Sequence, residues 1–120
     1  MAHILIIEDD PTLQEAYSFI LTARGHDVAS AYDGNQGLLL DKKQSYDIIL
    51  LDVHMPVMDG LEFLASYQPE LPENTKVILF SNMVEPEINK QALALGAYKC
   101  VLKSSMTPSA MLELIKSALA

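Results

Sequence analysis

Short apolar runs that alternate with helical segments constrain the fold of this chain more than any other feature of its sequence. Three runs, at residues 4–7, 48–51 and 77–80, consist only of Ile, Leu, Val and Phe. Continuous runs of this length indicate strands buried on both faces, as in a parallel sheet. Two less apolar runs, at 28–31 and 98–102, complete a prediction of five strands.

A segment with helical spacing of apolar residues follows each predicted strand. The first begins at Asp10-Pro11, a favourable N-cap and first-turn pair, and ends near Gly25, which suits a C-terminal cap. Further helices are expected at about 35–44, 61–67 and 85–95 and from Thr107-Pro108 onward, with a loop at 53–59. Five strand–helix alternations predict an α/β fold, a five-stranded parallel sheet with helices on both faces. The flavodoxin-like strand order 2-1-3-4-5 is the natural arrangement, although alternation alone does not fix it.

Length and composition indicate one domain over residues 1–120. Half of the 120 residues are hydrophobic, enough for a core, and no repeat or linker interrupts the pattern. The formal net charge is −8 and the eight Lys and Arg residues are scattered, which argues against direct binding of nucleic acid. A single cysteine, Cys100, together with the lack of a signal peptide or a membrane-length apolar run, predicts a soluble cytoplasmic protein. Excision from a larger protein is compatible with the sequence.

Ionisable or hydrogen-bonding residues follow four of the five predicted strands. Ligands of parallel sheets bind beyond the carboxyl ends of the strands, and strands 1, 3, 4 and 5 are neighbours in the proposed order. We therefore expect one pocket to collect Glu8, Asp9 and Asp10 from the first strand, Asp52 from the third, Ser81 from the fourth and Lys103 from the fifth. Taken singly, each is explained as a helix cap or a solvated loop residue, and capping is the preferred interpretation of Asp10.

Carboxylates gathered in this way point to a divalent cation. They repel one another, so either their pKa values rise or a cation binds between them, and Mg²⁺ suits a cluster of oxygen ligands. A central carboxylate such as Asp52 can also attack phosphorus, a step that needs alignment, a metal on the phosphoryl oxygens and a second cation such as Lys103. The residues alone predict a metal-binding acidic cluster, whereas phosphorylation does not follow from them.

Four motifs, in order and at strand ends, resemble the receiver domain of two-component response regulators. IIED at residues 6–9 is similar to the family's first strand and acidic pair. LDVHMPVMDG at residues 51–60 is the most specific match, because it contains the family's Asp, Met-Pro and Asp-Gly at the family's spacing. Ser81 stands where the family has Thr or Ser, and Lys103 stands where it has Lys. The resemblance covers the whole chain and is closest in kind to a chemotaxis-type single-domain receiver.

The resemblance implies a role for each residue of the predicted pocket. Asp52 would accept a phosphoryl group, and Ser81 and Lys103 would hold the phosphoryl oxygens. The implied Mg²⁺ ligands are Glu8, acting mainly through metal-bound water, Asp9, Asp52 and the backbone carbonyl of His54.

The resemblance also implies partners. The phosphodonor would be a phosphohistidine on a sensor histidine kinase or a phosphotransfer protein, with small acyl phosphates as substitutes. Phosphorylation would shift a conformational population at the face of the fourth helix, fifth strand and fifth helix, to be read by a downstream output protein or a missing effector domain. Such a domain catalyses only its own phosphorylation and dephosphorylation, so it is not an enzyme in the usual sense. A homodimer through the same face is compatible with the sequence.

The sequence departs from the family pattern at three positions. Ser104 replaces the proline that usually follows the lysine, so a trans peptide bond is expected there. Cys100 replaces an aromatic residue that usually swings inward, and we hypothesise that output relies less on an aromatic switch. Tyr98, on the same strand face, could take over part of that role, but a packed surface residue is the preferred interpretation. His54 either orients water at the phosphoryl group or is an exposed loop residue, and both interpretations stay open.

Two other functions compete with phosphoacceptance. The departures at Cys100 and after Lys103 allow a degenerate receiver that acts only as a protein-interaction or dimerisation module, but the retained acids, Ser81 and Lys103 argue against it. A phosphatase with a nucleophilic Asp generally needs a second Asp two residues later, where this chain has His54. No glycine-rich loop follows the first strand, which disfavours a flavin- or dinucleotide-binding domain.

Overall fold

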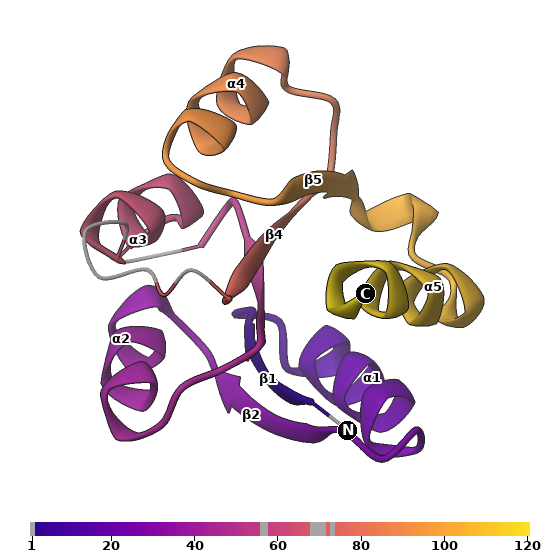
Figure 1. The fold of residues 1–120 in the computed structure, drawn as a ribbon. Coiled ribbons are helices and arrows are strands. Elements are labelled where there is room, and N and C mark those ends of the chain that lie inside the picture. The colour runs from indigo at the N-terminus through magenta and orange to yellow at the C-terminus, as the bar shows by residue number, and fades with distance from the viewer. Residues whose placement is uncertain (1, 56–57, 68–71, 73) are drawn as a thin grey trace.

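The chain folds into one twisted parallel sheet, seen in a computed structural model that describes residues 2–55, 58–67, 72 and 74–120 (Figure 1). The strands pair in the order β2-β1-β3-β4-β5, and every pairing is parallel. This confirms the predicted α/β fold with its flavodoxin-like strand order. The strands are β1 (His3–Ile7), β2 (Asp27–Ala31), β3 (Ile48–Asp52), β4 (Lys76–Ser81) and β5 (Lys99–Leu102).

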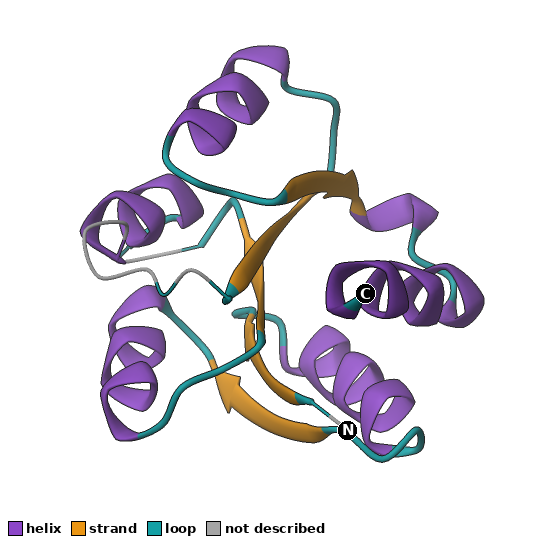
Figure 2. Cartoon of the chain, viewed as in Figure 1, coloured by secondary structure: helices purple, strands orange, loops and turns teal. Residues whose placement is uncertain are grey.

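In the described part of the chain, five α-helices cover the two faces of the sheet (Figure 2). Helices α1 and α5 lie on one face, and α2, α3 and α4 lie on the other. None of the helices in the described ranges combines the length and the apolar character that crossing a membrane requires. Their bounds are α1 (Pro11–Thr22), α2 (Gly34–Lys43), α3 (Gly60–Tyr67), α4 (Pro86–Ala94) and α5 (Pro108–Leu119).

Two cores, one on each face, account for the apolar runs of the sequence. Side chains along a strand point alternately to opposite faces, so Ile4 and Ile6 pack under α1 and α5 while Leu5 and Ile7 pack under α2 and α3. All four side chains are at most 1% exposed. The central strands are therefore apolar in their interiors, and polar residues stand only at their first and last positions, as His3, Lys76, Asp52 and Ser81 do.

Local signals begin and end the first helix as predicted. The Asp10 carboxylate accepts hydrogen bonds from the backbone N–H groups of Thr12 and Leu13, and Pro11 occupies the first turn. Gly25 and Gly96, which follow α1 and α4, have φ angles of 87° and 102°, a conformation that side chains with a Cβ disfavour. These residues fix where each chain segment turns back toward the sheet.

Most element boundaries lie within one residue of the prediction, and the differences at α2, at α4 and after β5 have local explanations. Helix α2 starts at Gly34 rather than 35 because Asp33 caps it by accepting the N–H of Gln36 at 2.8 Å. Helix α4 starts at Pro86, and Glu85 makes no side-chain capping bond to it. A short 3₁₀ helix at Lys103–Ser105, which was not predicted, follows β5 and is closed by a hydrogen bond from the Met106 N–H to the Lys103 carbonyl.

Candidate functional site

The carboxyl ends of the central strands deliver the predicted polar residues to one edge of the sheet. Glu8 and Asp9 follow β1, and Asp52 is the last residue of the neighbouring strand β3. Ser81 ends β4, the next strand along, and Lys103 follows β5. Parallel strands make this convergence unavoidable, because all their carboxyl ends meet at the same edge.

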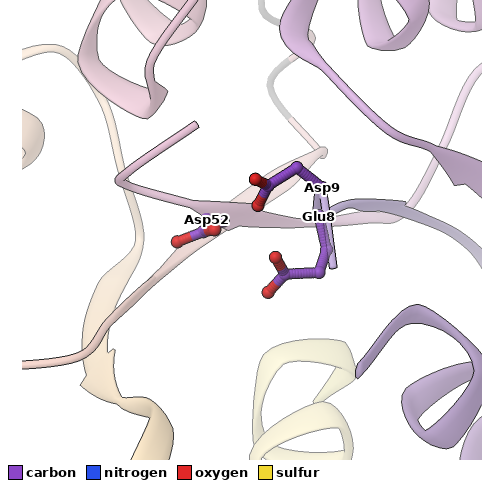
Figure 3. A group of neighbouring side chains, drawn as sticks. All are labelled: Glu8, Asp9 and Asp52. Carbon is purple, nitrogen blue, oxygen red and sulfur yellow. The ribbon is translucent and has the colours of Figure 1, made fainter. Parts of the chain in front are cut away.

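Three carboxyl groups form a compact acidic cluster at this edge (Figure 3). One oxygen each from Glu8, Asp9 and Asp52 lies within 4.8 Å of the other two. Glu8 and Asp52 are 2% and 4% exposed, whereas Asp9 faces solvent. Hard divalent cations prefer such a set of carboxylate oxygens, so the cluster could hold a metal ion with its open side toward Asp9.

Lys103 places a positive charge between the two buried acids. Its Nζ lies 2.8 Å from Glu8 Oε1 and 3.1 Å from Asp52 Oδ2, and its side chain is 12% exposed. Burial lowers the pKa of Lys103, but the hydrogen bond to Glu8 and the negative charges of Asp52 and Glu8 outweigh burial and raise it. The ammonium group therefore stays charged and compensates part of the acidic cluster.

Glu8 is the acid whose protonation the fold changes most clearly. Burial raises the pKa of Glu8 to about 7, against the opposing effect of the hydrogen bond from Lys103. The charge of Asp52 acts in the same direction as burial and contributes to this value. Without a bound cation, Glu8 therefore keeps its proton to a higher pH than an ordinary glutamate does, as expected for a carboxyl group in a crowded, desolvated cluster.

Backbone groups of the loop after β3 fix the Asp52 carboxylate. The His54 N–H donates a hydrogen bond to Asp52 Oδ1 at 3.2 Å, which brings the backbone of His54 beside the acidic cluster. Gly60 packs against this turn so closely that a Cβ added there would lie 2.7 Å from the Asp52 carbonyl oxygen. Its N–H donates to the Val53 carbonyl at 2.8 Å. Pro56 and Val57 of the most specific motif lie outside the described residues.

Ser81 lies at the same edge of the sheet, but its hydroxyl group hydrogen-bonds to Met83 and Glu85 rather than to Asp52. The side chain is 4% exposed, and Oγ lies 2.8 Å from the Met83 carbonyl and 3.0 Å from Glu85 Oε1, to either of which it can donate. The Met83 N–H donates back to Oγ at 3.3 Å. In this conformation Ser81 belongs to the turn between β4 and α4.

Glu85 is a residue of this edge that the sequence analysis missed. Its Oε1 lies 2.7 Å from His54 Nε2 and accepts from Ser81, so one carboxylate oxygen joins the loops after β3 and β4. The hydrogen bond from His54, followed by that from Ser81, lowers the pKa of Glu85. The sequence signals only a helix start at Glu85-Pro86, because the contact with His54 spans 31 positions.

Gln14 is a second residue that sequence analysis missed. Its Nε2 donates to the Ile6 carbonyl at 2.8 Å and the Ala31 carbonyl at 2.7 Å, and its side chain is 1% exposed. These bonds tie the carboxyl ends of β1 and β2 together directly below the acidic pair. Nothing in the sequence separates Gln14 from other polar residues of an amphipathic helix.

The departures noted in the sequence have structural counterparts. The peptide bond after Lys103 is trans, as predicted. Cys100 is half-buried and lines a cavity of about 50 Å³ together with Ser81 and Met83. Tyr98 precedes β5, at the opposite edge of the sheet from the acidic cluster, and its ring lies 5.2 Å from Lys76 Nζ. Its position supports the hypothesis that Tyr98 is a packed surface residue.

Comparison with known proteins identifies relatives over nearly the whole chain. The family model described as "Response regulator receiver domain" matches residues 4–116. The chain is 34% identical to the chemotaxis protein CheY of Treponema pallidum over 119 residues, which are 97% of this chain and 81% of that protein. It superimposes on the chemotaxis protein CheY4 of Vibrio cholerae with a TM-score of 0.91 and 28% identity, covering 99% of both chains.

Other relatives are considerably longer than this chain. The uncharacterised transcriptional regulatory protein YcbL of Bacillus subtilis is 31% identical over 111 residues, but the match spans 92% of this chain and only 46% of YcbL. The probable C4-dicarboxylate response regulator DctR of the same organism is matched over 45% of its length. The chain therefore corresponds to less than half of YcbL and of DctR, whereas it matches 81% of the Treponema pallidum CheY and 99% of the Vibrio cholerae CheY4.

Proposed function

The chain belongs to the response regulator receiver domain family, and on this basis we propose that it is a phosphoacceptor that takes a phosphoryl group from a phosphohistidine onto Asp52. The arrangement around Asp52 is the observation that carries the proposal. This carboxylate is buried at the end of a central strand, next to two further acids and 3.1 Å from the ammonium group of Lys103. The groups that phosphoryl transfer needs, acids that could hold a metal ion and a positive charge, thus surround one carboxylate nucleophile.

The proposed reaction is a displacement at phosphorus. A carboxylate oxygen of Asp52 forms a bond to phosphorus while the bond from phosphorus to the donor imidazole breaks, and the imidazole leaves with that electron pair. The His54 N–H, which already contacts Asp52 Oδ1, keeps the carboxylate oriented. The ammonium group of Lys103 contacts Asp52 Oδ2 and is close enough to stabilise the negative charge on the phosphoryl oxygens during transfer.

Glu8, Asp9, Asp52 and the backbone carbonyl of His54 are the proposed ligands of Mg²⁺. The oxygen-only donor set fits this ion, and the solvent-facing carboxylate of Asp9 leaves room for the water molecules that it retains. When bound, Mg²⁺ supplies positive charge to the phosphoryl oxygens. Ser81 would donate its hydroxyl to a phosphoryl oxygen after leaving its present partners.

We further propose how the signal passes on. Residues 1–120 act as one receiver domain that turns over no external substrate and receives its phosphoryl group from a sensor histidine kinase or phosphotransfer protein. Phosphorylation shifts the population of conformations at the face formed by α4, β5 and α5, where an output protein or an attached effector domain reads it. Ser81 ends the strand that pairs with β5, so a change at this residue can reach that face.

Intact mass after incubation with Mg²⁺ and acetyl phosphate tests the proposal. The wild type should gain one phosphoryl group, about 80 Da, and Asp52→Asn should gain none. Asp27→Asn is the matched control, because this exposed aspartate starts β2 at the opposite edge of the sheet and its loss should leave the gain intact. No gain with acetyl phosphate, with phosphoramidate or with a phosphohistidine protein would refute phosphoacceptance and favour an unphosphorylated interaction module.

A further inference from the structure

Glu85, a carboxylate outside the acidic cluster, contacts the hydroxyl group of Ser81. Glu85 Oε1 is 3.0 Å from Ser81 Oγ and 2.7 Å from His54 Nε2. Its side chain is 19% exposed, whereas the His54 side chain is 50% exposed. Glu85 is thus held at the mouth of the site by two partners that come from different loops.

We propose that Glu85 is a positioning residue that restrains the Ser81 hydroxyl in the unphosphorylated protein, and that His54 anchors Glu85 for this purpose. The inference rests on the proposed function, because it concerns the delivery of Ser81 to the phosphoryl group on Asp52. It adds a role for Glu85 and gives His54 a role through its side chain, separate from its backbone.

Hydrogen-bond stoichiometry supports a restraint on Ser81. A hydroxyl group has one proton, so Ser81 can donate to Glu85, to the Met83 carbonyl or to a phosphoryl oxygen, but only to one at a time. An ionised carboxylate is a stronger acceptor than a backbone carbonyl. Breaking the bond to Glu85 therefore opposes the movement of Ser81 toward Asp52 more than breaking a bond to Met83 would.

His54 links this restraint to the nucleophile itself. Its backbone N–H holds Asp52 Oδ1 and its ring holds Glu85, so the turn after β3 and the turn before α4 are joined through one residue. An unanchored Glu85 would turn into solvent, as exposed glutamates generally do. The absence of a capping bond from Glu85 to α4 agrees with a carboxylate committed to other partners.

The rate of phosphorylation by acetyl phosphate, followed by intact mass, tests the inference through a double-mutant cycle. The variants are Glu85→Ala, Glu85→Gln, Ser81→Ala and the double variant Ser81→Ala with Glu85→Ala. Glu85→Ala should be phosphorylated about threefold to tenfold faster than the wild type, because a charge-assisted hydrogen bond is replaced by the weaker neutral bond to the Met83 carbonyl. Glu85→Gln should fall between the two, because its amide oxygen is a weaker acceptor. In the Ser81→Ala background, the removal of Glu85 should change the rate little.

Glu87→Ala is the matched control, because it removes the same charge from an exposed position in the first turn of α4. An equal acceleration in Glu87→Ala, or an undiminished effect of Glu85→Ala in the Ser81→Ala background, would overturn the inference in favour of simple charge repulsion of the phosphodonor. Unchanged rates in both Glu85 variants would also overturn it. A wild type that no donor phosphorylates would instead refute the proposed function, and the inference with it.

Discussion

The buried carboxyl group of Glu8 should make the stability of the metal-free protein fall as the pH rises toward neutrality. Burial raises the pKa of Glu8 from 4.5 to about 7 in the folded state. Between these values the folded protein retains a proton that the unfolded chain has lost, so the free energy of unfolding decreases with increasing pH. This contribution is complete below pH 4.5 and is lost by about pH 7. At about 1.4 kcal/mol per pKa unit, the loss amounts to roughly 3 kcal/mol.

Urea unfolding of the wild type and of Glu8→Gln, with a chelator present, measures this contribution. Glutamine has the shape of glutamic acid but does not titrate, so the difference between the two free energies of unfolding isolates Glu8. Between pH 4.5 and pH 7, the free energy of unfolding of the wild type should fall by roughly 3 kcal/mol relative to that of Glu8→Gln. Glu15→Gln, at an exposed position of α1, should show a difference that is nearly independent of pH.

A difference that stays constant or favours the wild type as the pH rises would refute the reasoning. It would mean that the ion pair with Lys103, at 2.8 Å, keeps Glu8 ionised in the folded protein in spite of burial. Excess Mg²⁺ provides a further check. If Mg²⁺ binds the ionised carboxylates of the folded state, as proposed, it should reduce the decline of the wild type above pH 4.5.

Two further substitutions test the packing and the charge balance of the site by urea unfolding. Gly60→Ala should destabilise the protein by about 2 kcal/mol, because the added Cβ meets the backbone of Asp52 at 2.7 Å, whereas Gly34→Ala meets only a flexible side chain and should cost less. Equal free energies for these two variants would contradict the close approach. Lys103→Met should cost about 3 kcal/mol above pH 7 and less under acid conditions, where protonation of Glu8 removes one of the two buried negative charges. A loss no greater than that of Lys99→Met, at an exposed position, would show that the ammonium group is dispensable for folding.

The elements that were predicted well depend on local signals. Apolar runs of four residues identified the central strands, since only strands buried on both faces tolerate such runs. Asp10-Pro11 and Gly25 bound the first helix through hydrogen bonds and backbone angles that involve neighbouring residues alone. Small errors arose at helix starts, as at α2, which was predicted from about residue 35 and begins at Gly34 because Asp33 caps it.

The gathering of candidate site residues was predicted for a different reason. Parallel strands place all their carboxyl ends at one edge, so a sequence that ends its strands with acids, a hydroxyl and a lysine brings them together whatever the side-chain details. The proximity of Glu8, Asp9 and Asp52 follows from topology in this way. The 3₁₀ helix at Lys103–Ser105 could not be predicted from the topology, because it depends on how the chain passes from β5 to α5.

The sequence by itself determined the strand–helix alternation, the main helix caps and the residues at the edge of the sheet, because periodicity and capping act over a few neighbouring positions. Tertiary structure alone decided the raised pKa of Glu8, the hydrogen-bond partners of the Ser81 hydroxyl and the pairing of His54 with Glu85. Each of these depends on desolvation or on contacts between segments that lie far apart in the chain. Such contacts form only when the folded chain brings these distant segments side by side.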